Sequence, residues 1–180
     1  MSVTVVSGGV RSGKSRHAQA LFDGRADVTY LATGAPAADS TDPEWRDRVA
    51  RHVASRPSSW VTVETLDVAD VLRSPGGPVI VECLGTWLTG VVDRAGLWDD
   101  LDAAAAHVAD QSTSLVAALR STTREVVVVT NEVGWSLVPL TPPGRFFQDA
   151  LGRLNAAVAE VADDVVLVVM GRALRLGAAT

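Results

Sequence analysis

Short apolar runs alternate along this chain with longer stretches in which apolar and polar residues are mixed. The runs occupy residues 3–6, 28–31, 79–81, 126–129 and 165–169, with a further strand candidate at 60–64. They lack a strict alternation of apolar and polar positions, which is typical of strands that are covered on both faces. Each run therefore predicts a β-strand.

The intervening stretches predict helices at 15–22, 43–55, 66–73, 85–93, 97–120 and 144–162. Asp42-Pro43-Glu44 is a typical helix start, with an N-cap carboxylate, a proline in the first turn and an acidic side chain near the positive end of the helix dipole. Strands that alternate with helices predict an α/β fold, in which a mostly parallel sheet has helices on both faces. Ligands of such sheets bind at the carboxyl ends of the strands.

No repeat, linker or low-complexity segment interrupts this pattern, so we expect one domain over residues 1–180. Residues 74–78, Ser-Pro-Gly-Gly-Pro, predict a turn within it. The alanine-rich stretch 102–118, which includes His107, predicts an amphipathic covering helix and not a chemical site.

Composition narrows the classes of function. The net charge of −5 disfavours binding to nucleic acid, whose phosphates attract a basic surface, and makes a nucleotide the expected anion. The apolar runs are too short to span a bilayer, and the N-terminus lacks the pattern of a secretory leader. One cysteine, Cys83, excludes an internal disulfide and is typical of a reducing compartment, so we expect a cytoplasmic location.

Lys14 is the only lysine among the 16 lysines and arginines of the chain. It lies in a GxxxxGK[ST] motif between the first predicted strand and the first predicted helix, the context of a Walker A phosphate-binding loop. In such a loop backbone N–H groups turn toward an anion, the lysine meets the outer phosphates, and the serine hydroxyl ligates Mg²⁺. A glycine-rich turn that contains a lysine by chance is the alternative. The motif consists of Gly8, Gly9, Val10, Arg11, Ser12, Gly13, Lys14 and Ser15.

Two further strand ends would bring polar side chains to the same edge of the sheet. Glu82 follows the run at 79–81, where a phosphate-loop enzyme places the carboxylate that holds Mg²⁺ or its water. An ordinary carboxylate at a strand end fits this pattern equally well. Residues 130–134, Thr-Asn-Glu-Val-Gly, follow the run at 126–129 and predict a rim of the active site.

The predicted helix at 43–55 carries a histidine among arginines. Arg48 and His52 stand four residues apart, and Arg51 and Arg56 lie nearby. Neighbouring positive charge would keep the imidazole neutral and nucleophilic, and it would attract a nucleotide phosphate. A solvated basic helix face is the commoner explanation of such spacing, so the pattern alone leaves both interpretations open.

An ordered series of motifs covers nearly the whole chain. It comprises Gly-Gly-Val-Arg-Ser-Gly-Lys-Ser-Arg-His at 8–17, Tyr-Leu-Ala-Thr at 30–33, Arg48-Val49 with His52 and Arg56-Pro57, Trp-Val-Thr-Val-Glu at 60–64, Glu-Cys-Leu at 82–84 with Trp-Leu-Thr at 87–89, Thr-Asn-Glu-Val-Gly at 130–134 with Val138-Pro139, and Arg145 with Phe147, Asp149, Gly152 and Asn155. In this order the motifs resemble the bifunctional adenosylcobinamide kinase/adenosylcobinamide-phosphate guanylyltransferase family of cobalamin biosynthesis.

The resemblance implies a P-loop NTPase with a recombinase-like sheet, assembled as a homotrimer. Such an enzyme would phosphorylate adenosylcobinamide with ATP or GTP, and would then transfer GMP from GTP to the product through a covalent histidine intermediate. The matching histidine is His52, Lys14 would be catalytic with it, and Ser15 with Glu82 would hold Mg²⁺. Beyond the phosphate loop, the residues implied in contacts with GTP are Ala32, Thr33, Gly34, Val53, Ala54, Ser55, Arg56, Glu64 and Glu82.

Three features depart from the family pattern. Trp135-Ser136 replaces Met-Gly, Gly90 replaces an asparagine, and the C-terminal tail lacks a final lysine. These changes bear on substrate contacts more than on nucleotide binding. The sequence leaves open that Trp45 or Trp135 packs on a nucleotide base or a corrin ring, but because tryptophan is usually a core residue, burial is the expectation for both.

Two other functions agree with the phosphate loop. A P-loop kinase of another small hydroxyl compound would transfer a γ-phosphate without a covalent nucleotide. A non-catalytic GTP-binding switch would bind GTP without turnover. The sequence does not identify the phosphate donor of the kinase step or the natural corrinoid precursor. It also does not establish that both activities are retained.

Overall fold

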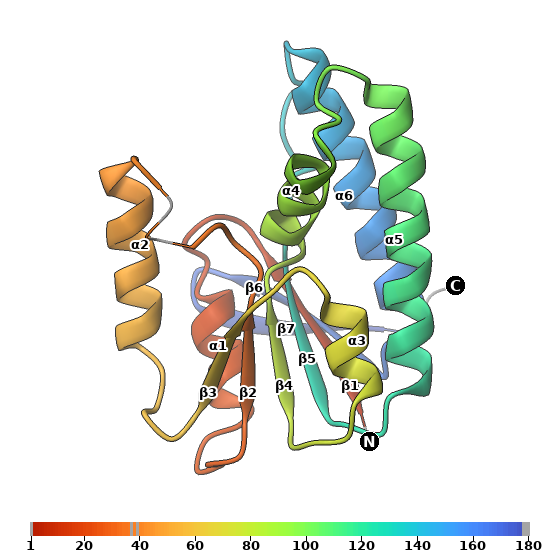
Figure 1. The fold of residues 1–180 in the computed structure, drawn as a ribbon. Coiled ribbons are helices and arrows are strands. Elements are labelled where there is room, and N and C mark those ends of the chain that lie inside the picture. Colours follow the sequence, from red (N-terminus) through yellow and green to blue (C-terminus); the bar gives the residue numbers. More distant parts are fainter. Residues whose placement is uncertain (1, 37, 39, 178–180) are drawn as a thin grey trace.

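A computed structural model describes residues 2–36, 38 and 40–177 of the chain. Within those residues seven strands form one sheet, and helices pack around it (Figure 1). The strands are β1 (Val3–Gly8), β2 (Thr29–Ala32), β3 (Val61–Glu64), β4 (Val79–Glu82), β5 (Val126–Asn131), β6 (Asp164–Val169) and β7 (Arg172–Leu176). The helices are α1 (Lys14–Ala20), α2 (Pro43–Ala54), α3 (Val68–Arg73), α4 (Leu84–Ala95), α5 (Leu101–Ser121) and α6 (Pro142–Glu160).

The strand order is β3-β2-β4-β5-β1-β6-β7. All neighbouring strands are parallel except the pair β6 and β7. The predicted α/β architecture with a mostly parallel sheet is therefore confirmed. In this order β5 lies between β1 and β4, so the strand that leads into the phosphate loop is separated from the strand that ends in Glu82.

Hydrophobic cores lie on both faces of the sheet, which explains why the apolar runs do not alternate. On β1, Val3 and Val5 pack in the core beneath α3 to α6, while Val6 packs on the opposite face with Ala18 and Phe22 around α1. The same division holds for β5, since its even-numbered valines join the first core and its odd-numbered valines join the second. Burial on both faces requires apolar side chains at consecutive positions.

The α2 helix differs from the other helices because it buries none of its residues, all of which the structure describes. It stands away from the sheet, on the side of the molecule where α1 lies (Figure 1). Its start is as predicted: Asp42 Oδ1 accepts a hydrogen bond of 2.9 Å from Glu44 N, and Pro43 is in the first turn. The neighbouring edge strand β3 is also largely exposed.

The structure differs from the sequence prediction in several places. The hairpin strand β7 was not predicted, because all five of its residues are exposed and supply no buried pattern. The helix expected from residue 97 begins at Leu101, since Gly96 ends α4 in a left-handed conformation and the Asp100 side chain caps α5. The expectation of buried tryptophans is wrong for Trp135, which is 74% exposed in the loop after β5.

Candidate active site

The phosphate loop connects β1 to α1 and is held in shape by its glycines. Gly13 has a φ of 97°, which only glycine adopts without strain. A Cβ atom at Gly8 would lie 2.5 Å from Val168 O and 2.6 Å from Ser12 Oγ, so the loop also passes too close to β6 for a side chain there. Ser12 N donates to Gly9 O at 3.2 Å and closes the turn. These constraints explain the glycine positions of the motif.

Lys14, Ser15 and Glu82 form a polar cluster at the start of α1. Lys14 is only 7% exposed, and its Nζ donates to Gly9 O at 3.3 Å. Burial lowers the pKa of Lys14, while the Glu82 carboxylate opposes that effect. Ser15 Oγ donates to Glu82 Oε1 at 2.6 Å. Burial raises the pKa of Glu82, against the hydrogen bond from Ser15 and the charge of Lys14.

The ends of β3, β2 and β4 place three predicted residues in one row. Ala32 pairs with Glu64 on one side and with Glu82 on the other. Beyond this row, Thr33 Oγ1 donates to Cys83 O at 2.8 Å and lies 2.8 Å from Thr86 Oγ1, which fixes the end of β2 against the start of α4. The two predicted glutamates therefore flank the same strand end.

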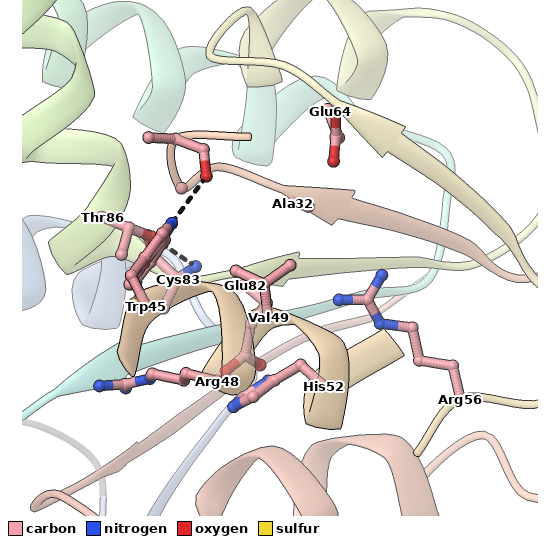
Figure 2. A pocket seen from close by; sticks show the side chains of 12 residues that line it. Ala32, Trp45, Arg48, Val49, His52, Arg56, Glu64, Glu82, Cys83 and Thr86 are labelled. Atoms are coloured by element: carbon pink, nitrogen blue, oxygen red, sulfur yellow. Dashed lines mark hydrogen bonds between the residues drawn. The ribbon is translucent and has the colours of Figure 1, made fainter. Parts of the chain in front are cut away.

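The α2 helix covers this row from the side. Figure 2 shows Trp45, Arg48 and His52 extending from α2 on the side that faces Glu82. Trp45 Nε1 donates to Ala35 O at 3.0 Å, and its ring would lie 2.8 Å from a Cβ atom at Gly34. Trp45 is thus partly exposed at the site and not in the core, contrary to the expectation of burial.

His52 lies in a positively charged and partly desolvated environment. Burial is the largest cause that lowers its pKa, followed by the charges of Arg48, Arg56, Lys14 and Arg51. The sequence indicated the arginines but not the burial. Arg56 is itself held in place, because its guanidinium lies 3.6 Å from the centre of the Tyr30 ring and donates to Thr62 Oγ1 at 3.0 Å. Both effects, burial and neighbouring positive charge, favour the neutral imidazole, in the direction that the sequence indicated.

Two cavities meet at His52. The first, which we call the loop cavity, has a volume of about 590 Å³ and extends over the phosphate loop. It is lined by residues 10–16, Gln19, Glu44, Arg48, Arg51, His52, Ser55, Glu82, Cys83 and Asn131.

The second, the side cavity, lies between α2 and the ends of β2, β3 and β4. It consists of a narrow part next to His52, lined by Arg48, His52, Arg56 and Glu82, and a wider part of about 560 Å³ that reaches Asp93. Ala32, Gly34, Trp45, Glu64 and Thr86 line both parts. His52, Arg48, Glu82 and Cys83 border the loop cavity and the side cavity alike, so His52 stands between them.

Most of the predicted residues meet around these cavities, although their roles remain predictions. Ser55 lines the loop cavity, whereas Thr33 and Arg56 line the side cavity. Val53 and Ala54 line neither, and Val53 is 53% exposed.

Several lining residues were not among the predicted ligands, including Trp45, Arg48, Thr86 and Asn131. Arg48 had a sequence signal in its spacing of four from His52, and Asn131 lies in the segment 130–134 that was predicted as a rim of the active site.

Comparison with known proteins gives a consistent result. Residues 4–176 match the family described as cobinamide kinase / cobinamide phosphate guanyltransferase. The bifunctional adenosylcobalamin biosynthesis protein CobU of Salmonella typhimurium is 38% identical over 183 residues, covering 96% of this chain and 98% of its own length. Its counterpart in Escherichia coli is 37% identical with the same coverage. The bifunctional adenosylcobalamin biosynthesis protein CobP of Pseudomonas aeruginosa is 35% identical, covering 93% of this chain and 92% of its own length.

A solved structure supports the fold alone. An ATPase from the type III secretion system of pathogenic bacteria superposes with a TM-score of 0.55 at 12% identity, covering 92% of this chain and 50% of its own. The predicted α/β fold of a P-loop NTPase is confirmed by this likeness together with the sheet. None of the helices that the structure describes is long and apolar enough to cross a membrane.

Proposed function

The chain belongs to the cobinamide kinase / cobinamide phosphate guanyltransferase family, and on that premise we propose that it catalyses both reactions of the family name. It is an enzyme that binds nucleotides. In the first reaction it phosphorylates the hydroxyl of adenosylcobinamide with ATP or GTP. In the second it transfers GMP from GTP to that phosphate and releases pyrophosphate, which yields adenosylcobinamide-GDP.

The kinase reaction would take place in the loop cavity. Phosphoryl transfer depends on positioning and on charge neutralisation more than on covalent help. The buried Lys14 ammonium and the inward N–H groups of the phosphate loop would bind the outer phosphates, and Arg48 and Arg51 line the same cavity. A phosphate bound there would raise the pKa of Lys14 and keep the ammonium charged, because opposite charge offsets desolvation.

Ser15 and Glu82 suit a magnesium ion. Glu82 Oε2 is buried and has no hydrogen-bond partner among the residues that the structure describes, while Oε1 accepts from Ser15. Mg²⁺ binds proteins through one or two oxygen ligands and keeps several waters, so one carboxylate and one hydroxyl are a fitting donor set. When bound, Mg²⁺ would neutralise charge on the phosphates. The buried carboxylate oxygen is the observation that supports this part of the proposal.

The guanylyl reaction belongs to His52, and the observation that carries it is the position of His52 between the two cavities. A GTP molecule with its outer phosphates in the loop cavity and its base in the side cavity has its α-phosphorus next to His52. The neutral imidazole would attack that phosphorus, the bond to the β-phosphate would break, and pyrophosphate would leave. The corrinoid phosphate would then displace the imidazole and restore His52.

The side cavity would distinguish guanine from adenine. The Glu64 carboxylate lines it and can accept hydrogen bonds from the N1–H and the amino group of guanine, whereas adenine presents an acceptor at N1. Arg56, held by Tyr30, and the ring of Trp45 border the same space. This part of the proposal explains why the second reaction would use GTP while the first accepts either nucleotide.

Three further parts of the proposal come from the sequence. The chain would act as one domain, as a homotrimer and in the cytoplasm. The family resemblance supports the trimer, the absence of a linker in the sequence supports the single domain, and the lone cysteine agrees with a reducing compartment.

The test is to incubate the protein with Mg²⁺ and GTP labelled at the α- or the γ-phosphate, and to measure bound label after denaturation. We expect α label that is acid-labile and alkali-stable, as a histidine phosphoramidate is, and that is lost in His52→Ala. His107→Ala is the matched control, since His107 lies on the covering helix α5. With adenosylcobinamide added, γ label should appear on the corrinoid.

The outcomes separate the alternatives. Phosphorylation of the corrinoid without α label on the protein would indicate a kinase that does not transfer guanylyl groups. GTP binding without any transfer would indicate a switch.

A further inference from the structure

The end of β5 lies between the two strands that carry the phosphate site. Asn131, its last residue, pairs with Gly8 of the phosphate loop, and Val129 pairs with Glu82. Asn131 therefore extends two residues beyond the level of Glu82, and it lines the loop cavity. A terminal phosphate held between Lys14 and Glu82 would lie over this strand end.

The backbone at Asn131 is fixed from two directions. Asn155 Nδ2 on α6 donates to Asn131 O at 3.0 Å, and Asn155 Oδ1 accepts from Thr130 Oγ1 at 2.6 Å. Glu132 N donates to Gly8 O at 3.2 Å, which ties the same strand end to the phosphate loop. The backbone position from which the Asn131 side chain projects is thus set before any ligand arrives.

The Asn131 side chain has an unused acceptor. Its Oδ1 is buried and finds no hydrogen-bond partner in the described part of the chain, while Nδ2 faces Cys83 Sγ at 3.9 Å. A buried acceptor without a partner destabilises the protein, so such groups in enzymes often have a ligand as their partner. The partner must be a donor, which excludes a phosphate, since phosphate oxygens at neutral pH are acceptors.

We propose that Asn131 Oδ1 accepts a hydrogen bond from the hydroxyl group of the acceptor substrate, and so orients that hydroxyl for attack in the kinase reaction. This inference rests on the proposed function. The other side chains around the loop cavity are mostly donors, such as Lys14, Arg48 and Arg51, and these suit the phosphates. Among the acceptors, Glu44 is exposed and Glu82 is already assigned to Mg²⁺ and to Ser15, whereas Asn131 Oδ1 is buried and without a partner in the described residues.

The step follows from this geometry. With its hydrogen directed to Asn131 Oδ1, the hydroxyl presents a lone pair to the γ-phosphorus. The new bond joins the hydroxyl oxygen to the γ-phosphorus, the bond to the β-phosphate oxygen breaks, and the nucleoside diphosphate leaves. The hydroxyl proton then passes to a negatively charged oxygen of the transferred phosphoryl group. Asn131 is not protonated at any stage.

The guanylyl reaction provides an internal reference, because labelling of His52 by GTP needs no acceptor hydroxyl. We would compare Asn131→Ala and the nearly isosteric Asn131→Leu with the wild-type enzyme. In both variants we expect the kcat of corrinoid phosphorylation to fall about 100-fold, as for loss of a group that orients a reactant. The KM for nucleotide and the rate of α labelling at His52 should stay within about threefold. Gln148→Ala, which removes a bond to Val133 O outside both cavities, is the control for general effects near β5.

Each outcome decides between explanations. Kinase activity within about threefold of wild type in either folded variant would overturn the inference. A parallel loss of α labelling, or a higher KM for nucleotide, would overturn it too, because the amide would then serve the phosphates, as it could by presenting Nδ2 after rotation. A wild-type enzyme without corrinoid phosphorylation would instead contradict the proposed function.

Discussion

Arg48 and His52 are four residues apart on α2, and their side chains border both cavities. Arg48 lowers the pKa of His52 in addition to the larger effect of burial. A lowered histidine pKa keeps the imidazole neutral, and thus nucleophilic, to lower pH. The acid limb of the pH profile for His52 labelling should therefore lie below the ordinary histidine value of about 6.5.

Replacing Arg48 with methionine should raise the pKa of His52 without restoring its ordinary value, because burial persists. The NMR titration of the imidazole in the ligand-free protein measures this shift, with His52→Ala to assign the signal. Arg46→Met removes the same charge from α2 at an exposed position that lines neither cavity. A rise in Arg46→Met as large as that in Arg48→Met would contradict the local origin of the effect.

At the scale of elements, α2 depends on its own capping because it buries no residue. Asp42→Ala removes the N-cap bond to Glu44 N, a loss of about 1 kcal/mol for the helix. Because α2 contributes so little to the core, this loss should appear as faster amide exchange in α2 and slower labelling of His52. The urea midpoint of global unfolding should hardly change.

Asp100→Ala is the matched comparison, since Asp100 caps α5 through Ala103 N at 3.0 Å and α5 buries five residues. There the loss of about 1 kcal/mol should lower the free energy of global unfolding and leave His52 labelling unchanged. If Asp42→Ala instead lowered the free energy of global unfolding, and Asp100→Ala instead slowed the labelling of His52, α2 would be part of the cooperative core.

The sequence predicted elements well where burial imposed a pattern, and poorly where it did not. The valine runs of β1, β4 and β5 are buried on both faces, so their apolar character is continuous and easily read. In β7 the residues Arg-Ala-Leu-Arg-Leu are all exposed, and only pairing with β6 defines the strand.

The site shows the same limit. The phosphate loop is a local motif and could be read directly, and so could the spacing of Arg48 and His52. That Trp45 lies at the site and that Asn131 Oδ1 lacks a partner depends on how α2 and β5 are placed beside distant strands. The residues next to Trp45 and Asn131 in the sequence do not indicate how these elements are placed.

At the scale of the whole molecule, Arg124 joins elements at the end of the sheet opposite to the cavities. It is 6% exposed, and its guanidinium donates to Gly77 O at 2.6 Å, to Val71 O at 3.1 Å and to Thr29 Oγ1 at 2.9 Å. Burial lowers its pKa. The predicted turn at 74–78 is thus packed against this arginine, and a Cβ atom at Gly76 would lie 2.9 Å from the guanidinium.

Arg124→Met should reduce the free energy of unfolding by about 3 kcal/mol, because three partly buried acceptors lose their donor. Arg120→Met breaks only an exposed ion pair with Glu160 at 3.9 Å and should cost less than about 1 kcal/mol. Urea unfolding measures both values. Labelling of His52 under native conditions should be the same in the two variants. Slower labelling in Arg124→Met alone would show that packing at this end of the sheet affects the active site.

The single lysine has a consequence for proteolysis. A protease that cleaves only after lysine has one susceptible bond in the chain, between Lys14 and Ser15, and the side chain that it must engage is almost fully buried. The bond becomes available only when the start of α1 opens. The rate at which such a protease divides the chain into two fragments thus measures the opening of the phosphate loop itself, and a bound nucleotide would slow that rate in proportion to its occupancy.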